Sequence, residues 1–355
     1  WALVKQGHDA SVIAAKLVRD YAVSPETAEK FTRSILRDLV SGRFLNDDEL
    51  PSTASTVVDN GRVFPADGCE KLPALVYQVC FNVGNVFIEV FSDSRHCIDL
   101  LEGTFEFLKN RRKQYKHESP VRICIESEAG GRFTVRYGRI VVEDCAFDEL
   151  APIVHGVFVV RFYEANFTSL AFHCAAMCSD AGMILIPGAS GSGKSTLVAA
   201  LAASGFPYIT DELVLVDVQQ SRIIGAPLAI GLKKGSWDLS GEFYPHIEQM
   251  ASFRRQDGQH IKYVTPASVC KDYTFDSISC IVFPRLIDED VLSLHPLSVP
   301  ETFARLTEAG YDTNRKLRIQ DVGNILGWIG SIPAYEMRYR NLGAAVQEIV
   351  ALSKV

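Results

Sequence analysis

The sequence predicts a mixed fold of the α/β (α+β) class with more than one domain, and three observations support this. The chain of 355 residues is 47% apolar and 22% charged, the composition of an ordinary globular protein. Short β-rich runs separated by turn residues dominate positions 74–170, interrupted by one helix at about 98–113. From 183 to 204, an apolar strand, a glycine-rich loop and a strong helix sequence follow one another.

Hairpins are expected at two places in the β-rich part. Two strands flank Asn82-Val83-Gly84-Asn85, and two more flank Ala129-Gly130-Gly131, which are turn sequences. The strands expected before the glycine-rich loop lie at 76–81, 86–91, 121–125, 133–137, 140–142, 156–162 and 170–174. After the loop, we expect strands near 208, at 213–218 and at 278–283, and helices at 300–309 and 343–352.

The first 73 residues divide into a helical segment and a polar linker. Apolar residues such as Ile13, Leu17 and Tyr21 recur at helical spacing, and Ser24-Pro25 is a helix start signal. A polar stretch with several Pro and Ser residues and no period follows. The predicted divisions are a helical domain at 1–48, a linker at 49–73 and a large domain at 74–355, with a β-rich part at 74–170 and a core at 171–355.

Charge and cysteine usage exclude several classes of protein. A formal net charge of −7 gives no basic face, which argues against a nucleic-acid-binding protein. No apolar run approaches the ~18 residues that could span a membrane. The nine cysteines form no C-x-x-C pair and no zinc-ligand spacing, so we expect free thiols in a reducing, cytoplasmic compartment.

The glycine-rich loop fits the pattern G-x-x-x-x-G-K-[S/T]. Glycines let successive backbone N–H groups turn towards phosphate oxygens, and the following helix directs its positive end at the same charge. Lys194 would neutralise the β- and γ-phosphates, and the Ser195 hydroxyl would bind Mg²⁺. The predicted nucleotide-binding residues are Gly188, Ala189, Ser190, Gly191, Ser192, Gly193, Lys194, Ser195 and Thr196.

Two adjacent carboxylates, Asp211 and Glu212, follow Lys194 by seventeen residues and end a short predicted strand. If that strand neighbours the strand before the loop, one carboxylate can bind Mg²⁺ and the other can accept a proton from an attacking hydroxyl. Asp217, after the next strand, is the competing metal-associated residue. His173, fifteen residues before Gly188, is either structural or a contact of the phosphates or the acceptor.

Taken together, these residues resemble the catalytic core of HPr kinase/phosphorylase and of the HPr-kinase-like proteins. His173, the loop, and Asp211-Glu212 at their spacing carry the resemblance, with an Ala-Pro-Leu run at 226–233 and a Val-Phe-Pro strand at 282–284. It covers roughly 75–355. The resemblance implies a P-loop kinase domain related to phosphoenolpyruvate carboxykinase and Mg²⁺-ATP as phosphoryl donor to a serine hydroxyl. By position, Asp211 would be the base, Glu212 the second acid, and His173 the histidine near the acceptor.

The sequence departs from this family at two places. Glu212 stands where the family has Asp, and positions 223–227 lack the acid of the family's Glu-x-x-Gly signature. Reverse phosphorolysis is therefore not expected. The family's N-terminal domain is not recognisable in the sequence, so HPr is not the expected substrate. The arginine that would stabilise the transition state is left open among Arg254, Arg255 and Arg285.

Residues 1–45 resemble the helical part of a PqqD-like winged-helix domain, a module that captures leader peptides of ribosomally made natural products; its strands would precede Trp1. The carrying residues are Trp1, Gly7, Ile13, Leu17, Tyr21, Val23, Ser24, Ala28, Phe31, Leu36, Leu39, Phe44 and Leu45. The sequence-based hypothesis is an ATP-dependent serine/threonine kinase of a peptide or protein. Neither nucleic acid nor a membrane is an expected partner, and a homo-oligomer is left open. The alternatives are a kinase of a small hydroxylated metabolite and a non-catalytic regulatory nucleotide-binding protein.

Overall fold

The structure is a computed structural model that describes residues 76–109, 120–138, 140–166, 170–188, 191–217, 220, 222–270, 272–310 and 319–353, with Ala15 and Pro25 as isolated positions. The predicted domain at 1–48 and the linker at 49–73 lie outside the described residues, apart from those two positions. The described residues form a mixed α/β structure with four sheets, so the predicted fold class is confirmed at this level.

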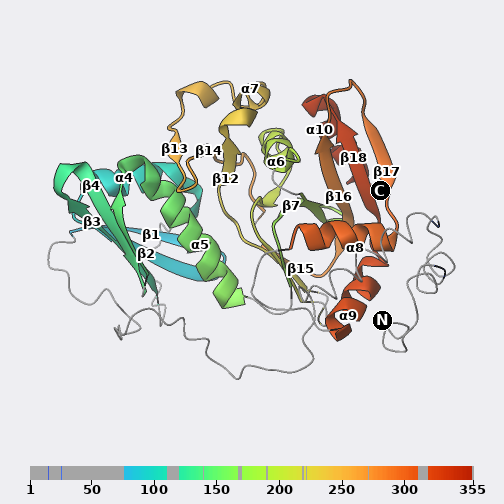
Figure 1. The fold of residues 1–355 in the computed structure, drawn as a ribbon, viewed down its shortest axis with the longest axis horizontal. Helices are drawn as coiled ribbons and strands as arrows, with labels where there is room; N and C mark the ends of the chain where they lie inside the picture. Colours follow the sequence, from blue (N-terminus) through green and yellow to red (C-terminus); the bar gives the residue numbers. More distant parts are fainter. Residues whose placement is uncertain are drawn as a thin grey trace.

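A five-stranded sheet, at the left of Figure 1, forms the β-rich part. Its strands, in spatial order, are β1 (Tyr77–Val83), β2 (Val86–Ser92), β3 (Val121–Glu128), β4 (Arg132–Tyr137) and β5 (Ile140–Cys145). Both predicted hairpins are confirmed, because β1 pairs with β2 and β3 pairs with β4 in antiparallel register. The parallel pair β2 and β3 is joined by a connection that contains α4 (Arg95–Thr104) and η1 (Glu106–Leu108).

Two expectations for this part were wrong. The strand predicted at 156–162 belongs to the helix α5 (Leu150–Asn166), which is preceded by η3 (Phe147–Glu149). The run Val157-Phe158-Val159-Val160 has the β-branched composition of a strand, yet Leu150, Val154 and Phe158 recur at intervals of four and are buried against the sheet. The predicted helix at 98–113 begins earlier and, within the described residues, α4 ends at Thr104.

The second large sheet, at the right of Figure 1, has six strands in the order β17-β18-β16-β8-β7-β9. Their bounds are β17 (Ser293–Pro296), β18 (Ala334–Tyr339), β16 (Ile278–Leu286), β8 (Gly182–Pro187), β7 (Cys174–Ser179) and β9 (Tyr208–Thr210). Strands β18, β16 and β8 are parallel, so their carboxyl ends meet at one edge. In α/β sheets, ligands bind at that edge.

Two smaller sheets lie between and beside the large ones. The four-stranded sheet has the order β15 (Thr274–Phe275), β11 (Arg222–Gly225), β10 (Val214–Asp217) and β6 (Leu170–Phe172). The three-stranded sheet has the order β12 (Ile230–Lys233), β14 (His260–Val264) and β13 (Phe253–Arg254). The remaining helices are α6 (Lys194–Ala203), η4 (Lys234–Ser236), α7 (Trp237–Ser240), η5 (Ile247–Gln249), α8 (Val299–Glu308), α9 (Ile319–Ile329) and α10 (Leu342–Leu352).

Opposite faces of the six-stranded sheet pack against different helices. Ile184 and Ile186 of β8 share a core with α6 and α10. The alternate residues Met183 and Leu185 share another core with α8, α9 and the four-stranded sheet. This alternation is the two-residue period of a strand buried on both faces, and it places α6 and α8 on opposite sides of β8.

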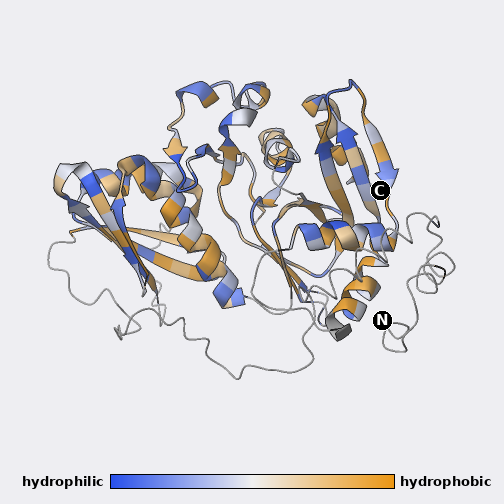
Figure 2. Ribbon diagram, viewed as in Figure 1, coloured by the Kyte–Doolittle hydropathy of each residue, from blue (hydrophilic) through white to orange (hydrophobic). Residues whose placement is uncertain are grey.

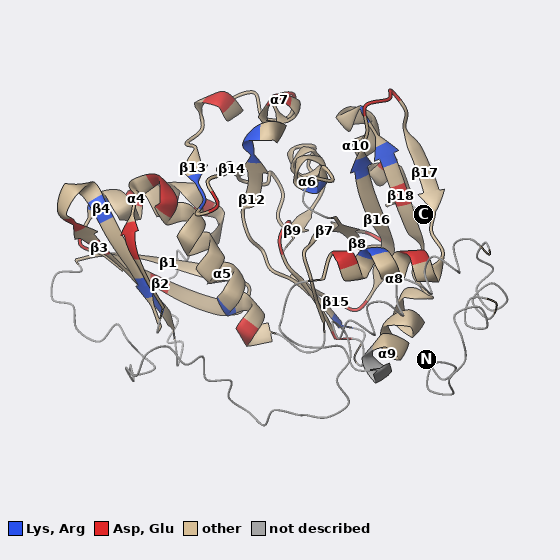
Figure 3. Ribbon diagram, in the orientation of Figure 1, with Lys and Arg blue, Asp and Glu red and all other residues tan. Residues whose placement is uncertain are grey.

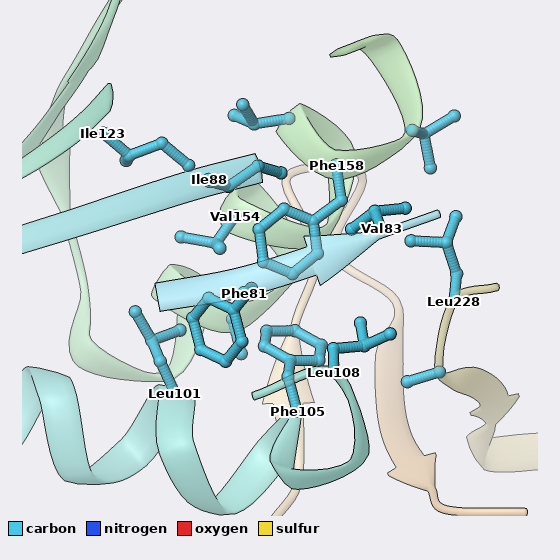
Figure 4. Close-up of a cluster of buried hydrophobic side chains, with 14 of the residues drawn as sticks. Phe81, Val83, Ile88, Leu101, Phe105, Leu108, Ile123, Val154, Phe158 and Leu228 are labelled. Atoms are coloured by element: carbon cyan, nitrogen blue, oxygen red, sulfur yellow. The ribbon is translucent and has the colours of Figure 1, made fainter. Parts of the chain in front are cut away.

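A third core joins the five-stranded sheet to the middle of the molecule. Phe81, Phe105 and Phe158 form its centre (Figure 4). The ring centroid of Phe158 lies 5.4 Å from that of Phe81 and 5.3 Å from that of Phe105. Figure 2 shows hydrophobic residues along β1, β2 and α5. The same core continues into the segment after β11, where Ala226 and Leu228 are fully buried.

The described residues also answer two expectations drawn from composition. None of the helices in the described part of the chain is long and apolar enough to cross a membrane. Seven cysteines have free thiols, but Cys124 is disulfide-bonded, so the expectation of free thiols was wrong for this residue. The spacing of nearby cysteines reveals metal sites and C-x-x-C pairs only. A disulfide can join cysteines far apart in the sequence, so this spacing does not reveal it.

Candidate functional site

The glycine-rich loop lies between the carboxyl end of β8 and the start of α6, as the sequence predicts for the residues that the structure describes; Ala189 and Ser190 are outside them. Gly193 immediately precedes α6 in the left-handed backbone region, with φ of 88°. A Cβ at this position would also lie 2.6 Å from Tyr339 Oη. Glycine is therefore required here for two independent reasons.

The loop is held by the ends of the two neighbouring parallel strands. The backbone N–H of Leu286, the last residue of β16, donates to Ser192 O at 3.2 Å. The hydroxyl of Tyr339, the last residue of β18, donates to Gly193 O at 3.3 Å. The Ser192 hydroxyl is buried without a hydrogen-bond partner among the described residues, and a Cβ on Gly188 would collide with it. A buried hydroxyl of this kind needs a partner, and a phosphate oxygen could supply one.

Lys194 and Asp211 form a buried ion pair at the base of the loop. Lys194 Nζ lies 2.8 Å from Asp211 Oδ1, and the two side chains are only 4% and 5% exposed. The same ammonium also donates to the backbone oxygen of Asp211. Asp211 follows β9, which pairs with β7 and not with β8, so the expectation of adjacent strands was wrong. The long lysine side chain spans the intervening strand.

His173 and Glu212 form a second, more open pair beside the first. His173 Nε2 lies 3.8 Å from Glu212 Oε2, and the side chains are 37% and 34% exposed. Burial lowers the pKa of His173 from its ordinary value, and the positive charge of Lys194 lowers this pKa further against the opposing effect of Glu212. At neutral pH the ring is therefore uncharged and can exchange hydrogen bonds with a hydroxyl group.

The backbone around His173 is fixed from the other face of the sheet. His173 lies between β6 and β7, and its N–H donates to Ala309 O at 2.7 Å, just after the end of α8. The adjacent Phe172 forms an isolated bridge with Gly310. These contacts set the position of the imidazole relative to α8.

His155 is a further residue near this site that sequence reasoning missed. It lies on α5, its Nε2 is buried without a hydrogen-bond partner among the described residues, and burial lowers its pKa. The negative charges of Glu212 and Asp211 act on it in the opposite direction, which places it near them. No local pattern identified it, because the sequence predicted a strand at 156–162 and no helix that would include His155.

Of the other candidates, Asp217 is set apart. Its side chain accepts a hydrogen bond from Gln220 N at 3.1 Å, at the end of β10 opposite to Val214, the residue paired with Phe172. Lys194 binds Asp211 instead.

The three candidate arginines also differ in position. Arg254 lies 3.6 Å from Asp148 and 3.3 Å from Glu149, on the side of the five-stranded sheet. Arg255 pairs with Asp257. Arg285 comes directly before Leu286, whose N–H donates to the loop, but its guanidinium lies 3.6 Å from Glu336 instead, so none of the three arginines is assigned to the transition state.

The chemistry of the donor set fits Mg²⁺ bound together with a nucleotide. Among the described residues, no group of three or more His, Cys, Asp or Glu side chains is arranged to hold a metal. Mg²⁺ commonly takes one or two protein oxygens and completes its shell with phosphate oxygens and water. Ser195, at the second position of α6, and the half-exposed Glu212 offer such oxygens, while Asp211 is bound by Lys194.

Comparisons with known proteins find similarity to solved structures. No protein-family model matches the sequence, and no curated protein matches it. The structure of the Hpr(Ser) kinase/phosphatase from Coxiella burnetii aligns over 51% of this chain and 93% of its own, with a TM-score of 0.24 and 12% identity. Similarity at this level assigns neither a family nor a function to this chain.

Proposed function

We propose that this protein is an ATP-dependent kinase that transfers the γ-phosphoryl group to a serine or threonine hydroxyl of a peptide or protein. The observation that carries the proposal is the Lys194–Asp211 pair, 2.8 Å apart, at the start of a helix that follows a glycine-rich loop. The pair joins a phosphate-binding cation to a carboxylate in one place, which is what phosphoryl transfer requires.

Nucleotide binding would rest on the loop and the first turn of α6. Backbone N–H groups and the positive end of the helix attract phosphate oxygens. Lys194 would bind the β- and γ-phosphates, and the buried Ser192 hydroxyl would gain a partner. Ser195 and Glu212 would hold Mg²⁺, which supplies charge neutralisation between the phosphates when bound.

The transfer step then needs a base and an aligned hydroxyl. The acceptor O–H gives its proton to a carboxylate while its oxygen forms a bond to the γ-phosphorus, and the bond from that phosphorus to the β-phosphate oxygen breaks to release ADP. We assign the base to Asp211 and propose that neutral His173 orients the hydroxyl. Glu212, 3.8 Å from His173, is the competing base.

A peptide acceptor is proposed from the resemblance of residues 1–45 to a leader-peptide-binding module. Tethering a peptide beside the active site raises its effective concentration, so the catalytic domain needs little affinity of its own. Deletion of residues 1–48 should therefore reduce phosphorylation of a full-length precursor. Unchanged activity would instead favour a kinase of a small hydroxylated metabolite.

Substitution of the two carboxylates tests the assignment of the base. Asp211→Asn should bind ATP, measured by calorimetry, and lower turnover of ³²P transfer to a serine peptide library by about 10²- to 10⁴-fold. The matched control is Asp217→Asn, which alters a similarly buried aspartate at the far end of β10 and should keep its turnover.

Three outcomes would change the proposal. Unchanged turnover in Asp211→Asn, with a loss in Glu212→Gln, would move the base to Glu212. Tight ATP binding by the wild type with neither labelled acceptor nor released phosphate would favour a non-catalytic nucleotide-binding protein. Absence of ATP binding would reject the proposal.

A further inference from the structure

Three arginines surround a single buried glutamate beside the phosphate loop. Glu336, on β18, has a side chain that is 5% exposed. Its carboxylate lies 3.1 Å from Arg305 Nη2 on α8, 2.9 Å from Arg338 Nη2 on the same strand, and 3.6 Å from Arg285 Nη1 on β16. We call these four residues the arginine cluster.

The charges of the arginine cluster do not balance. Glu336 is the only carboxylate within ion-pair distance of these arginines among the described residues, so three positive charges share one negative charge. The glutamate is buried, whereas the side chains of Arg285, Arg338 and Arg305 are 61%, 43% and 34% exposed. A guanidinium remains charged at all ordinary pH values and offers several donors. The cluster therefore presents uncompensated positive charge to solvent, on a chain whose net charge is −7.

Two arginines of the cluster immediately precede the strand-end residues that contact the loop. Arg285 and Arg338 are paired across β16 and β18, and the following pair, Leu286 and Tyr339, contacts the loop at Ser192 and Gly193. Because side chains alternate along a strand, the arginines face the side of the sheet opposite to Leu286 and Tyr339. Figure 3 shows basic residues on the ends of β16 and β18 and on α8.

The third arginine connects the cluster to the other side of the site. Arg305 lies one helical turn before Ala309, whose carbonyl oxygen accepts the hydrogen bond from His173 N. The same helix therefore carries one arginine of the cluster and the carbonyl group that holds the backbone of His173. It is not itself part of the Lys194–Asp211 pair, and the charges that act on His173 most strongly are Lys194, Glu212, Asp211 and Lys233.

We propose that the arginine cluster binds an acidic segment of the peptide acceptor and so makes this enzyme selective for serine or threonine flanked by Asp or Glu. This inference rests on the proposed function. The γ-phosphate already has Lys194 and the loop amides as partners, so the surplus charge one strand away suits a second anion. Long arginine side chains near the ends of two strands and on a helix can place their guanidinium groups for bidentate contacts with carboxylates.

The contribution is expected mainly in binding of the acceptor. Exposed ion pairs are individually weak and are screened by salt, and they act on encounter and specificity more than on the chemical step. Loss of two arginines should therefore raise the KM for an acidic peptide by about 10-fold and leave kcat nearly unchanged.

The direct test uses two labelled peptides and the full-length chain. One fluorescein-labelled peptide carries a serine between runs of three glutamates, and its matched version carries glutamines. Fluorescence anisotropy measures the binding of each peptide to the wild type, to Arg285→Gln and to Arg285→Gln/Arg338→Gln. The control variant is Arg340→Gln, an exposed arginine at the same sheet edge that has its own partner, Asp288, at 2.9 Å. A fluorescent ATP analogue reports nucleotide binding, and a salt titration of the wild type adds a measurement that needs no variant.

The proposal predicts that the glutamate peptide binds more tightly than the glutamine peptide, that salt removes the difference, and that the double variant loses it while Arg340→Gln keeps it. Equal binding of the two peptides to the wild type would overturn it. The proposal would also be overturned if the double variant lost ATP-analogue binding as strongly as glutamate-peptide binding, because the cluster would then bind the nucleotide. Failure of the proposed function would give a different result. The acidic peptide would still bind to the cluster, but no phosphoryl transfer dependent on Lys194 would be detected.

Discussion

Two groups of opposite charges lie beside the same loop, and they are built differently. The Lys194–Asp211 pair balances one cation with one anion, and both side chains are almost completely buried. In the arginine cluster only the anion, Glu336, is buried, while its three cations reach solvent. The first arrangement fixes a geometry, since neither charge can leave its partner without a large penalty. The second leaves charge available for an external anion.

The largest expected effect comes from breaking the balanced pair. Lys194→Met should lower the free energy of unfolding by about 3–5 kcal/mol, because Asp211 would remain buried without a counter-charge. It should also abolish phosphoryl transfer. Urea unfolding and ³²P transfer measure the two effects.

A double variant separates stability from chemistry. Lys194→Met/Asp211→Leu removes both charges and should recover much of the lost stability without recovering transfer. A Lys194→Met protein as stable as the wild type would show that the Lys194–Asp211 pair does not stabilise the fold.

Removal of the anion from the arginine cluster should have a smaller effect. Burial alone would raise the pKa of Glu336, but Arg305 and Arg338 outweigh it and hold this pKa below the ordinary 4.5. The carboxylate therefore contributes stability that is present above about pH 4.5 and is lost as the pH falls through the lowered pKa. Glu336→Gln should cost about 1–3 kcal/mol at pH 7, and the difference from wild type should shrink below pH ~4.5. A difference in urea unfolding that stays constant with pH would contradict this account.

The smallest expected effect concerns His155, a half-buried residue whose ring Nε2 is fully buried and which forms no ion pair with the described residues. Burial lowers its pKa from the ordinary 6.5, so below that pH the unfolded chain binds a proton that the folded protein does not. Stability should therefore fall as the pH decreases below about 6.5, until the lowered pKa of the folded protein is reached. In His155→Gln this pH dependence should be weaker. Urea unfolding at several pH values measures it, and His260→Gln, at an exposed histidine, is the control; equal slopes in both variants would reject the assignment.

The sequence predicted those parts of the molecule that are encoded locally. The hairpins at Gly84 and Gly130 follow from their turn residues, and the strand–loop–helix around Lys194 follows from its motif. The segment 156–162 of α5 was wrongly predicted as a strand because its β-branched run matches a strand, and its burial against the sheet decides the outcome. Tertiary packing overrode local preference there.

The remaining features depend on contacts between distant segments. Asp211 reaches Lys194 across β7, an order of strands that no local pattern specifies. The arginine cluster joins Arg285, Arg305 and Arg338 from three elements, and its outermost members are fifty-three positions apart in the sequence. Arg285 was one of three candidates in the sequence, but only its position relative to the loop sets it apart from Arg254 and Arg255.

The core that begins between β1 and α5 does not stop at the boundary expected near residue 170. Leu213, Ala226 and Leu228, which belong to the part of the chain with the glycine-rich loop, are fully buried within it. A fragment that starts after residue 170 would expose this apolar surface, and exposed patches of this kind favour aggregation. The β-rich part therefore forms one packed unit with the half that carries the glycine-rich loop, and a fragment for expression must retain both.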